Sequence, residues 1–514
     1  MKQPETILIL DFGSQYTQLI ARRVRENKVF SLILPCNVSI KKIKKVNPSG
    51  IILSGGPSNV YQKNSPSPAK EIYSLNIPIL GICYGMQLIA HASGGKVKKT
   101  VLREYGHAEL AIDKREDIFY KLPKKIKVWM SHGDEVSILP KGFQKIAHTQ
   151  NAPVAALRNK ERRVFGIQFH PEVIHTPLGG KIIANFLFKV CRLSANWTPQ
   201  NFIKDTIKEI RKKVGGEKVI LGLSGGVDSS VAALLIHKAV GRRLRCIFVD
   251  NGVLRHNERQ RVQNTFKKHF GLNLRVVNAE KTFLTKLKGI EDPERKRKII
   301  GREFIKTFEK EAHKIGRVKF LAQGTLYPDV IESVSFYGGP TSTIKSHHNV
   351  GGLPKKLKLS LIEPLRELFK DEVREVGRAM GLADELVDRQ PFPGPGLAVR
   401  IIGSFTKKRA DLLRAADTIL LDEIRKAGLY KKLWQSFMVL LPIKSVGVMG
   451  DVRTYEHVVV IRAVTSRDGM TADWARISHS VLNTISNRII NEVRGINRVC
   501  LDISSKPPAT IEWE

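Results

Sequence analysis

The chain has 514 residues, 42% of them apolar, so it can bury more than one hydrophobic core and is expected to form two or three domains. Its apolar runs are no longer than single strands, which excludes a membrane span, and its first residues lack the pattern of a secretory signal, which predicts a cytoplasmic protein. Its 86 Lys and Arg against 48 Asp and Glu give a net charge of +38. Because these basic residues are spread along the whole chain, we expect no specific nucleic-acid partner.

The first two hundred residues alternate short apolar strands with amphipathic helices. Strands are expected at residues 7–10, 50–53, 79–82 and 165–169, and helices at residues 16–26, from residue 84 onward and at 181–191. Such alternation predicts an open α/β sheet with helices on both faces. The pattern pauses at residues 194–199, so we expect a first domain over residues 1–195.

A second open α/β domain is expected over residues 196–390. It is predicted to contain helices at 202–214 and 231–239, strands at 219–223 and 245–249, and a glycine loop after the first of these strands. Loops at the carboxyl ends of strands are where open α/β sheets bind ligands. Residues 333–358 are expected to form a long lid loop, in which His347 and His348 could meet a substrate but are not metal-ligand candidates.

A smaller α+β domain is expected over residues 391–514. It opens on Pro-Phe-Pro-Gly-Pro-Gly, which interrupts any helix or strand. Helices are predicted at residues 408–427 and 474–491, and strands at 437–441 and 457–463. The fold class is therefore α/β, with two successive open sheets followed by this smaller domain.

The five cysteines are an odd number with no Cys-x-x-Cys pair, which excludes a disulfide framework and a zinc site. Only Cys83 is expected to act chemically. It lies in Gly-Ile-Cys-Tyr-Gly, where an apolar strand runs straight into a helix. Glycines on both sides permit the strained turn of a nucleophile elbow, and a helix N-terminus favours the thiolate.

His170 and Glu172 are the candidate partners of this thiolate. They follow the strand at residues 165–169, and side chains two apart on a strand point the same way, so Glu172 can orient the imidazole. Gly56, in a Gly-Gly-Pro loop after another strand, can donate its backbone N–H to an oxyanion together with the Tyr84 amide.

These segments, Gly-Ile-Cys-Tyr-Gly, His-Pro-Glu and Ser-Gly-Gly-Pro, together resemble the class I glutamine amidotransferases. The resemblance implies that Cys83 attacks the side-chain amide of glutamine, forms a thioester and releases ammonia. It also implies that His170 is the general base and acid and that Glu172 orients it. For this module alone the alternative is a cysteine peptidase of similar fold. His107 and His132 are expected to be structural residues around the pocket.

A glycine loop joins the strand at 219–223 to the next helix. Its residues are Ser224, Gly225, Gly226, Val227, Asp228, Ser229 and Ser230. Glycines let the backbone curl around a phosphate, and the helix N-terminus and the hydroxyls supply donors. The loop lacks the Gly-Lys-Ser/Thr of a kinase-type P-loop and resembles that of N-type ATP pyrophosphatases. That resemblance implies ATP binding by the loop with Val249 and Asp250, and a role for Asp228 in holding Mg²⁺.

A glutaminase followed by an ATP pyrophosphatase resembles the GMP synthases over essentially the whole chain, including the C-terminal Lys-Pro-Pro-Ala-Thr-Ile-Glu-Trp-Glu. The resemblance implies glutamine, ATP and XMP as substrates, and a third domain that forms a homodimer. It also implies four contacts to the acceptor nucleotide: Arg297, Lys506, Ile511 and Glu512. Cations are suited to a monophosphate, although Arg297 also fits a solvated helix face.

Two alternatives stay open at this point. One is an amidotransferase that makes NAD or modifies another carboxylate or carbonyl; the C-terminal segment and the type of glutaminase argue against it. The other is a tRNA-modifying or RNA-binding protein in which the same loop adenylylates a base, a function that the charge of +38 would suit.

Overall fold

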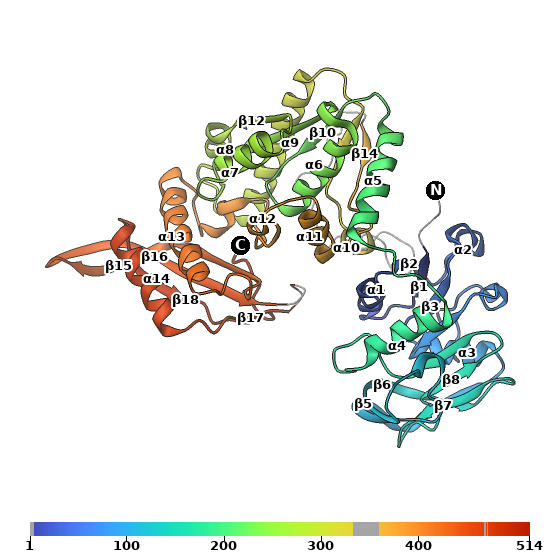
Figure 1. Ribbon diagram of the computed structural model, residues 1–514. Coiled ribbons are helices and arrows are strands. Elements are labelled where there is room, and N and C mark those ends of the chain that lie inside the picture. Colours follow the sequence, from blue (N-terminus) through green and yellow to red (C-terminus); the bar gives the residue numbers. More distant parts are fainter. Residues whose placement is uncertain (1–4, 333–358, 467–468, 470) are drawn as a thin grey trace. The chain divides into compact units, whose positions relative to one another are not determined.

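The computed structural model describes residues 5–332, 359–466, 469 and 471–514 (Figure 1). Its described residues form two compact units: those up to 202 with 330–332 make the first, and 203–329 with those from 359 onward make the second. The predicted lid, with His347 and His348, lies outside the described residues. The domain limits at 195/196 and 390/391 stay predictions. None of the helices in the described parts has the length and apolar character required to cross a membrane.

The first unit is built on a nine-stranded sheet in the order β2-β1-β3-β4-β9-β8-β7-β5-β6. Its strands are β1 (Thr6–Asp11), β2 (Phe30–Pro35), β3 (Gly50–Leu53), β4 (Ile79–Ile82), β5 (Lys96–Ile112), β6 (Lys125–Ile138), β7 (Gln144–His148), β8 (Ala156–Asn159) and β9 (Val164–Ile167). The five strands from β2 to β9 are parallel and the others antiparallel. Strands β3, β4, β8 and β9 are buried throughout, as in a sheet covered on both faces.

Some of the helices in this unit connect consecutive parallel strands, and the others follow β4, β5 or β9 in the chain. They are α1 (Thr17–Glu26), α2 (Ile40–Val46), η1 (Lys70–Ser74), α3 (Tyr84–Ala92), η2 (Asp117–Phe119), α4 (Gly179–Asn185) and η3 (Phe186–Val190). The predicted strand at 165–169 is too long, because β9 ends at Ile167 and the chain turns before His170.

The second unit contains a five-stranded parallel sheet in the order β12-β11-β10-β13-β14. Its strands are β10 (Val219–Gly222), β11 (Leu244–Asp250), β12 (Leu274–Asn278), β13 (Phe320–Ala322) and β14 (Ser360–Ile362). The chain adds β11 and β12 on one side of β10 and then returns to add β13 and β14 on the other. The carboxyl end of β10 is therefore the switch point of the sheet, where ligands bind in such folds.

Several helices and turns complete this part of the second unit. They are α5 (Pro199–Val214), which begins in the first unit, α6 (Val227–Val240), η4 (Gly241–Arg243), α7 (Glu258–Val262), η5 (Gln263–His269), α8 (Glu280–Leu287), α9 (Pro293–Lys314), α10 (Tyr327–Glu332), α11 (Lys370–Ala379), α12 (Asp384–Val387) and η6 (Gly396–Arg400). The start of α9 follows from its sequence: Pro293 suits the first turn, and the Asp292 side chain accepts a hydrogen bond from the Arg295 N–H at 2.7 Å.

The C-terminal part is an α+β layer with its own sheet. Its elements are α13 (Lys407–Lys426), β15 (Gln435–Met449), β16 (Val452–Thr465), β17 (Asp473–Trp474), α14 (His479–Glu492) and β18 (Ile496–Leu501). The predicted helix at 474–491 is wrong at its start, because Trp474 pairs with Val464 across the sheet and α14 begins only at His479. One hydrophobic cluster joins this layer to the five-stranded sheet, with Ile220 and Ile485 among its members.

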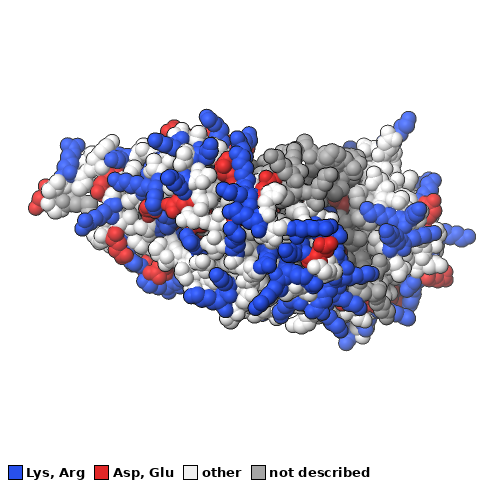
Figure 2. All heavy atoms as spheres, turned by 90° about the horizontal axis from the view of Figure 1, so that it is seen from above, with Lys and Arg blue, Asp and Glu red and all other residues white. Residues whose placement is uncertain are grey.

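The expected order of two open α/β sheets and a smaller α+β part is therefore confirmed. Lys and Arg side chains are spread over the face seen in Figure 2 and are interleaved with uncharged residues and a few acidic ones. This distribution agrees with the scattered basic residues of the sequence.

Candidate functional site

Cys83 lies at the sharp turn between β4 and α3. Its backbone angles are φ 52° and ψ −106°, a left-handed conformation that is strained for any residue with a β-carbon. The neighbouring glycines are required for space: a methyl group on Gly81 would lie 2.4 Å from the Gly85 carbonyl oxygen, and one on Gly85 would lie 2.3 Å from that of Leu53. The turn thus has the geometry of a nucleophile elbow, with the sulfur at the start of a helix.

The His170 imidazole is held by Glu172 close to Cys83. Its Nδ1 is 2.7 Å from Glu172 Oε1, and Cys83 is near enough to act on the ring electrostatically. His170 and Glu172 are both buried. Burial disfavours the imidazolium, but the negative charge of Glu172 and the contact with Cys83 outweigh it and hold the pKa of His170 well above its ordinary value. The arrangement suits an imidazole that takes and returns protons beside a sulfur nucleophile.

Backbone contacts fix the loop that carries these residues. The His170 N–H donates to the Trp129 carbonyl at 3.0 Å, and the Thr176 hydroxyl donates to the His170 carbonyl at 2.7 Å. Arg23 Nε donates to the Glu172 carbonyl at 3.0 Å. The two side chains therefore meet because the turn is anchored, and not because they share a strand.

The glycine pair after β3 lies against the same site. A methyl group on Gly55 would lie 3.2 Å from His170 Cε1, and one on Gly56 would lie 3.3 Å from Tyr84 Cδ1. Neither the Gly56 nor the Tyr84 N–H donates to another residue in the described part of the chain. Two unused N–H groups beside the nucleophile are what an oxyanion hole requires, and this role stays a prediction.

Two further side chains of the site were missed in the sequence. Gln168 Nε2 lies 3.7 Å from the Cys83 sulfur, and the Tyr16 ring packs edge-on against His170, with ring centres 5.2 Å apart. Gln168 could have been found by its place two residues before His170. His132 forms a buried hydrogen bond with Glu104, Nε2 to Oε2 3.2 Å, and His107 packs on Trp129, which agrees with structural roles for both histidines.

Gly179, the first residue of α4, is packed against the peptide between His170 and Glu172. A methyl group there would lie 1.9 Å from the Pro171 carbonyl oxygen, whereas at Gly180 it would meet nothing within 4 Å. We expect Gly179→Ala to destabilise the fold by about 1–3 kcal/mol through overpacking, and Gly180→Ala to stabilise it by up to about 1 kcal/mol. Chemical unfolding of both variants measures the difference, and equal stabilities would contradict the packing seen here.

The glycine loop of the second unit lies at the switch point of its sheet, between β10 and α6. Gly225 has φ +78°, and the Ser224 hydroxyl, 3.0 Å from that of Ser229, accepts from the Gly226 N–H at 3.3 Å. Val227 is the first residue of α6, and the Ser230 hydroxyl donates to the Gly226 carbonyl at 2.7 Å. The loop therefore places hydroxyl groups beside a helix N-terminus at the switch point of the sheet, an arrangement suited to phosphate binding.

Val249 and Asp250 end the neighbouring strand β11, so the parallel pairing brings them to the same edge of the sheet as this loop. Lys370, the first residue of α11, was missed in the sequence. Its Nζ donates to both carboxylate oxygens of Asp228, at 2.7 and 2.6 Å. The two residues are 142 positions apart, and nothing in the local sequence signals their contact.

No group of three or more His, Cys, Asp or Glu side chains among the described residues is arranged to bind a metal ion. Mg²⁺ in nucleotide sites is commonly held by one or two carboxylates together with phosphate oxygens. Asp228, at the start of a helix in a phosphate-type loop, fits that donor set.

The predicted acceptor residues fall into two contact groups. Arg297, in α9, donates through Nη2 to the Glu514 carbonyl, beside the fully buried Lys296, whose Nζ is 2.6 Å from Glu514 Oε2. Helix α9 and the C-terminal residue of the chain are therefore in direct contact. Lys506 donates to the Gly469 carbonyl at 2.8 Å.

Ile511 and Glu512 make contacts within the fold. Ile511 packs on the cluster that contains Phe437. Glu512 accepts from the buried Arg400 at 2.8 and 3.1 Å and from Gln435 Nε2 at 2.6 Å. Their contact with a nucleotide stays a prediction.

Comparisons with known proteins agree with this architecture. Residues 8–190 match the family "Glutamine amidotransferase class-I", residues 200–304 match "NAD synthase" and residues 422–513 match "GMP synthase C terminal domain". The first match covers the Cys83 site and the second covers the glycine loop.

Relatives match the chain along its whole length. The "GMP synthase [glutamine-hydrolyzing]" of Brachyspira hyodysenteriae is 60% identical over 510 residues, which are 99% of each chain. That of Aquifex aeolicus is 56% identical over 512 residues, which are 100% of each chain. Similarity of this extent covers the glutaminase, the glycine loop and the C-terminal segment together, and the chain belongs to the family of glutamine-hydrolysing GMP synthases.

Proposed function

We propose that this enzyme converts XMP, ATP, glutamine and water to GMP, AMP, pyrophosphate and glutamate. Glutamine-dependent synthesis of GMP follows from the family. The observation that carries the glutaminase half is the buried His170–Glu172 hydrogen bond close to the strained turn of Cys83. XMP as the acceptor is the proposed part.

In the glutaminase half, the Cys83 sulfur attacks the amide carbon of glutamine. The amide oxygen becomes negative and accepts hydrogen bonds from the Gly56 and Tyr84 N–H groups. His170 gives its proton to the departing nitrogen, so that ammonia leaves and a thioester remains. His170 then takes a proton from water, which hydrolyses the thioester to glutamate and frees the sulfur. Glu172 holds the imidazole in the required orientation throughout.

In the synthetase half, the xanthine O2 attacks the α-phosphorus of ATP and pyrophosphate leaves. Ammonia then attacks C2, and the oxygen departs with AMP. The 224–230 loop would hold the phosphates, with Val249 and Asp250 beside the nucleotide. Asp228 would hold Mg²⁺, which when bound offsets phosphate charge. Arg297 and Lys506 would hold the anionic acceptor, with Ile511 and Glu512 beside it.

We propose a homodimer formed through the C-terminal part. The support is the long β15–β16 hairpin, on which Val446, Val448, Val452 and Tyr455 are exposed, Val448 by 74%. Apolar residues exposed together favour burial by a partner. Analytical ultracentrifugation tests this proposal, because Val448→Lys should shift the dimer toward monomer.

The five cysteines are unpaired, which supports a reducing compartment such as the cytoplasm.

The experiment that tests the acceptor supplies purified protein with Mg-ATP and ammonium chloride, with or without XMP. GMP and AMP should form together and only when XMP is present. Salt-dependent retention of the protein on RNA, without XMP turnover, would instead support the tRNA-modifying alternative.

Glu172→Gln is expected to change the pH dependence of glutamine hydrolysis. The substitution removes the negative charge that raises the pKa of His170, so the limb of the kcat/KM profile that reports this imidazole should move to lower pH. The rate should fall by on the order of 10²- to 10⁴-fold, as when the orienting carboxylate of a triad is neutralised. Glutaminase assays across pH measure both effects.

The same substitution should reduce stability over a defined pH range. A raised folded-state pKa contributes stability that is present below the unfolded pKa of about 6.5 and is lost as pH rises through the folded value. Glu172→Gln should therefore cost stability at acidic and neutral pH. Glu109→Gln, at an exposed glutamate of β5, is the control and should change neither measurement. If the limb of the kcat/KM profile stays at the same pH in Glu172→Gln, Glu172 does not act through His170.

A further inference from the structure

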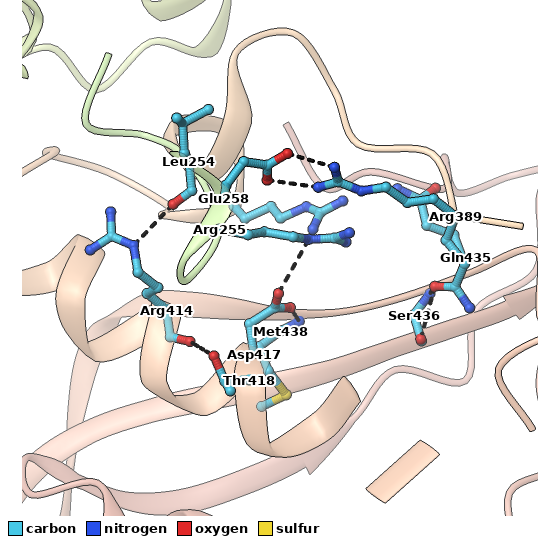
Figure 3. A network of polar contacts seen from close by, with 12 residues as sticks. Leu254, Arg255, Glu258, Arg389, Arg414, Asp417, Thr418, Gln435, Ser436 and Met438 are labelled. Atoms are coloured by element: carbon cyan, nitrogen blue, oxygen red, sulfur yellow. Dashed lines mark hydrogen bonds and ion pairs between the residues drawn. The ribbon is translucent and has the colours of Figure 1, made fainter. Parts of the chain in front are cut away.

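A cavity of about 200 Å³, lined mostly by charged and polar residues, lies in the second unit between the loop after β11 and helix α13. Figure 3 shows the contacts of Arg255 and Asp417, which line it. None of its lining residues belongs to the 224–230 loop, and neither Val249 nor Asp250 reaches it. Four arginines and two carboxylates are among these lining residues: Arg255, Arg261, Arg389, Arg425, Glu385 and Asp417.

Two of these arginines already have a carboxylate partner. Arg389 forms a bidentate pair with the buried carboxylate of Glu258, at 2.5 and 2.7 Å. Arg261 lies 3.7 Å from Glu385. Arg255 and Arg425 therefore face the cavity against the single carboxylate of Asp417.

Arg255 is the lining residue whose guanidinium lacks hydrogen-bond acceptors among the residues that the structure describes. Its side chain is 9% exposed, and its ion pair with Asp417 is long, Nε to Oδ2 3.5 Å. Nε and Nη2 have no hydrogen-bond partner within the described residues. Burial lowers the pKa of Arg255 to about 10, Asp417 only partly opposes this, and Arg400 and Arg389 add to it. A buried guanidinium with free N–H groups is unfavourable unless something accepts from them.

The position of Arg255 is fixed from both sides. Arg414, in α13, donates to the Leu254 carbonyl through Nε and to the Gly252 carbonyl through Nη2, both at 2.9 Å. Asp417 is held in turn, because its Oδ1 accepts from the Met438 N–H at 3.0 Å. These contacts hold the loop backbone and the Asp417 carboxylate in place, so Arg255 lines the cavity from a fixed position in the chain.

We infer that this cavity is a binding site for a free phosphate-type oxyanion, with Arg255 as the principal donor. A guanidinium presents paired N–H groups that match phosphate oxygens, and the surplus of positive charge suits an anion. The volume is below the roughly 300–1,000 Å³ of pockets that enclose drug-sized molecules, which favours phosphate or pyrophosphate over a whole nucleotide.

The site adjoins the nucleotide loop without being part of it. Arg389 lines the cavity, and its Nη1 also donates to the Gly225 carbonyl at 3.2 Å. An anion in the cavity would therefore influence the loop through one side chain. The site itself requires neither XMP nor glutamine, so it can be tested independently of the proposed function.

The test is calorimetric titration of the full chain with inorganic phosphate at constant ionic strength. Wild type should show an Arg255-dependent binding component that weakens at least tenfold in both Arg255→Gln and Arg255→Lys. Arg317→Gln, at an exposed arginine before β13, should bind like wild type. Ser229→Ala, in the glycine loop, should retain the Arg255-dependent component. Phosphate binding that is unchanged in Arg255→Gln, or lost entirely in Ser229→Ala, would overturn the inference.

Two further measurements complete the test. AMP and adenosine serve as separate titrants: a tighter Arg255-dependent component with AMP than with phosphate would identify a nucleotide phosphate as the source, and one with adenosine would overturn the inference. Wild-type crystals soaked in sodium tungstate need no variant. An anomalous peak beside Arg255 supports the site, and a peak at the glycine loop alone overturns it.

Discussion

Cys83→Ala is expected to abolish GMP formation from glutamine while leaving GMP formation from ammonium chloride within about twofold of wild type. Removal of a nucleophile commonly costs on the order of 10⁴-fold or more in rate. Supplied ammonia bypasses that chemistry entirely. Alanine keeps a β-carbon at φ 52°, so it meets the same backbone strain as cysteine and the elbow should persist.

Cys500→Ala is the matched control, because its thiol is exposed and lies in the other unit. It should support both nitrogen sources as wild type does. Activity with glutamine that survives in Cys83→Ala would show that Cys83 is not the nucleophile. Loss of both activities would instead show that the substitution damages the fold, and unfolding measurements would then identify the damage.

Short apolar segments made much of the first unit predictable. Strands β1, β3 and β4 are brief runs rich in Ile and Leu that are buried almost throughout, which is typical of a parallel sheet covered on both faces. The nucleophile elbow was predictable for the same reason, since a strand, a flanked cysteine and a helix are adjacent in sequence. Strands β5 and β6 were not predicted, because each mixes charged and apolar residues over a long span. They are stabilised by side-chain pairs between the two strands, which the sequence of one strand does not reveal.

The pairing of His170 with Glu172 was expected, but for a reason that the structure does not support. The strand ends at Ile167, and the two side chains meet through a turn held by Thr176 and Trp129. Those anchors are six and 41 residues from His170 in sequence, beyond the reach of a local pattern.

Buried cations were the largest gap between sequence and structure. Arg400, Arg462 and Lys296 are fully buried, although Arg and Lys are ordinarily exposed. Each is compensated by the C-terminal segment: Arg400 by Glu512, Arg462 by the Ser504 and Thr510 carbonyls, and Lys296 by Glu514. A basic residue in the sequence gives no sign of such a partner, because the partner is brought by the fold.

Asp228→Asn is expected to reduce GMP formation about 10³-fold from glutamine and from ammonium chloride alike. The carboxylate lies in the first turn of α6, within the loop that would hold ATP, and the proposed phosphate chemistry needs its charge there. Asparagine preserves the shape of the side chain and removes only that charge. Cys83→Ala and Asp228→Asn should thus differ in one respect: supplied ammonia rescues the first and fails to rescue the second.

Asp228 could instead serve only as a structural partner of Lys370. The effect of the substitution on stability distinguishes this role from a role in the ATP site. The pair is partly exposed, 31% for Asp228 and 41% for Lys370, and exposed pairs contribute about 0–1 kcal/mol to stability. Asp228→Asn should therefore unfold close to wild type while its AMP-forming activity is lost, and Asp205→Asn, at an exposed aspartate of α5, should retain both. A variant that loses stability in proportion to activity would assign Asp228 to the fold, and full activity with ammonium chloride would remove it from the ATP site.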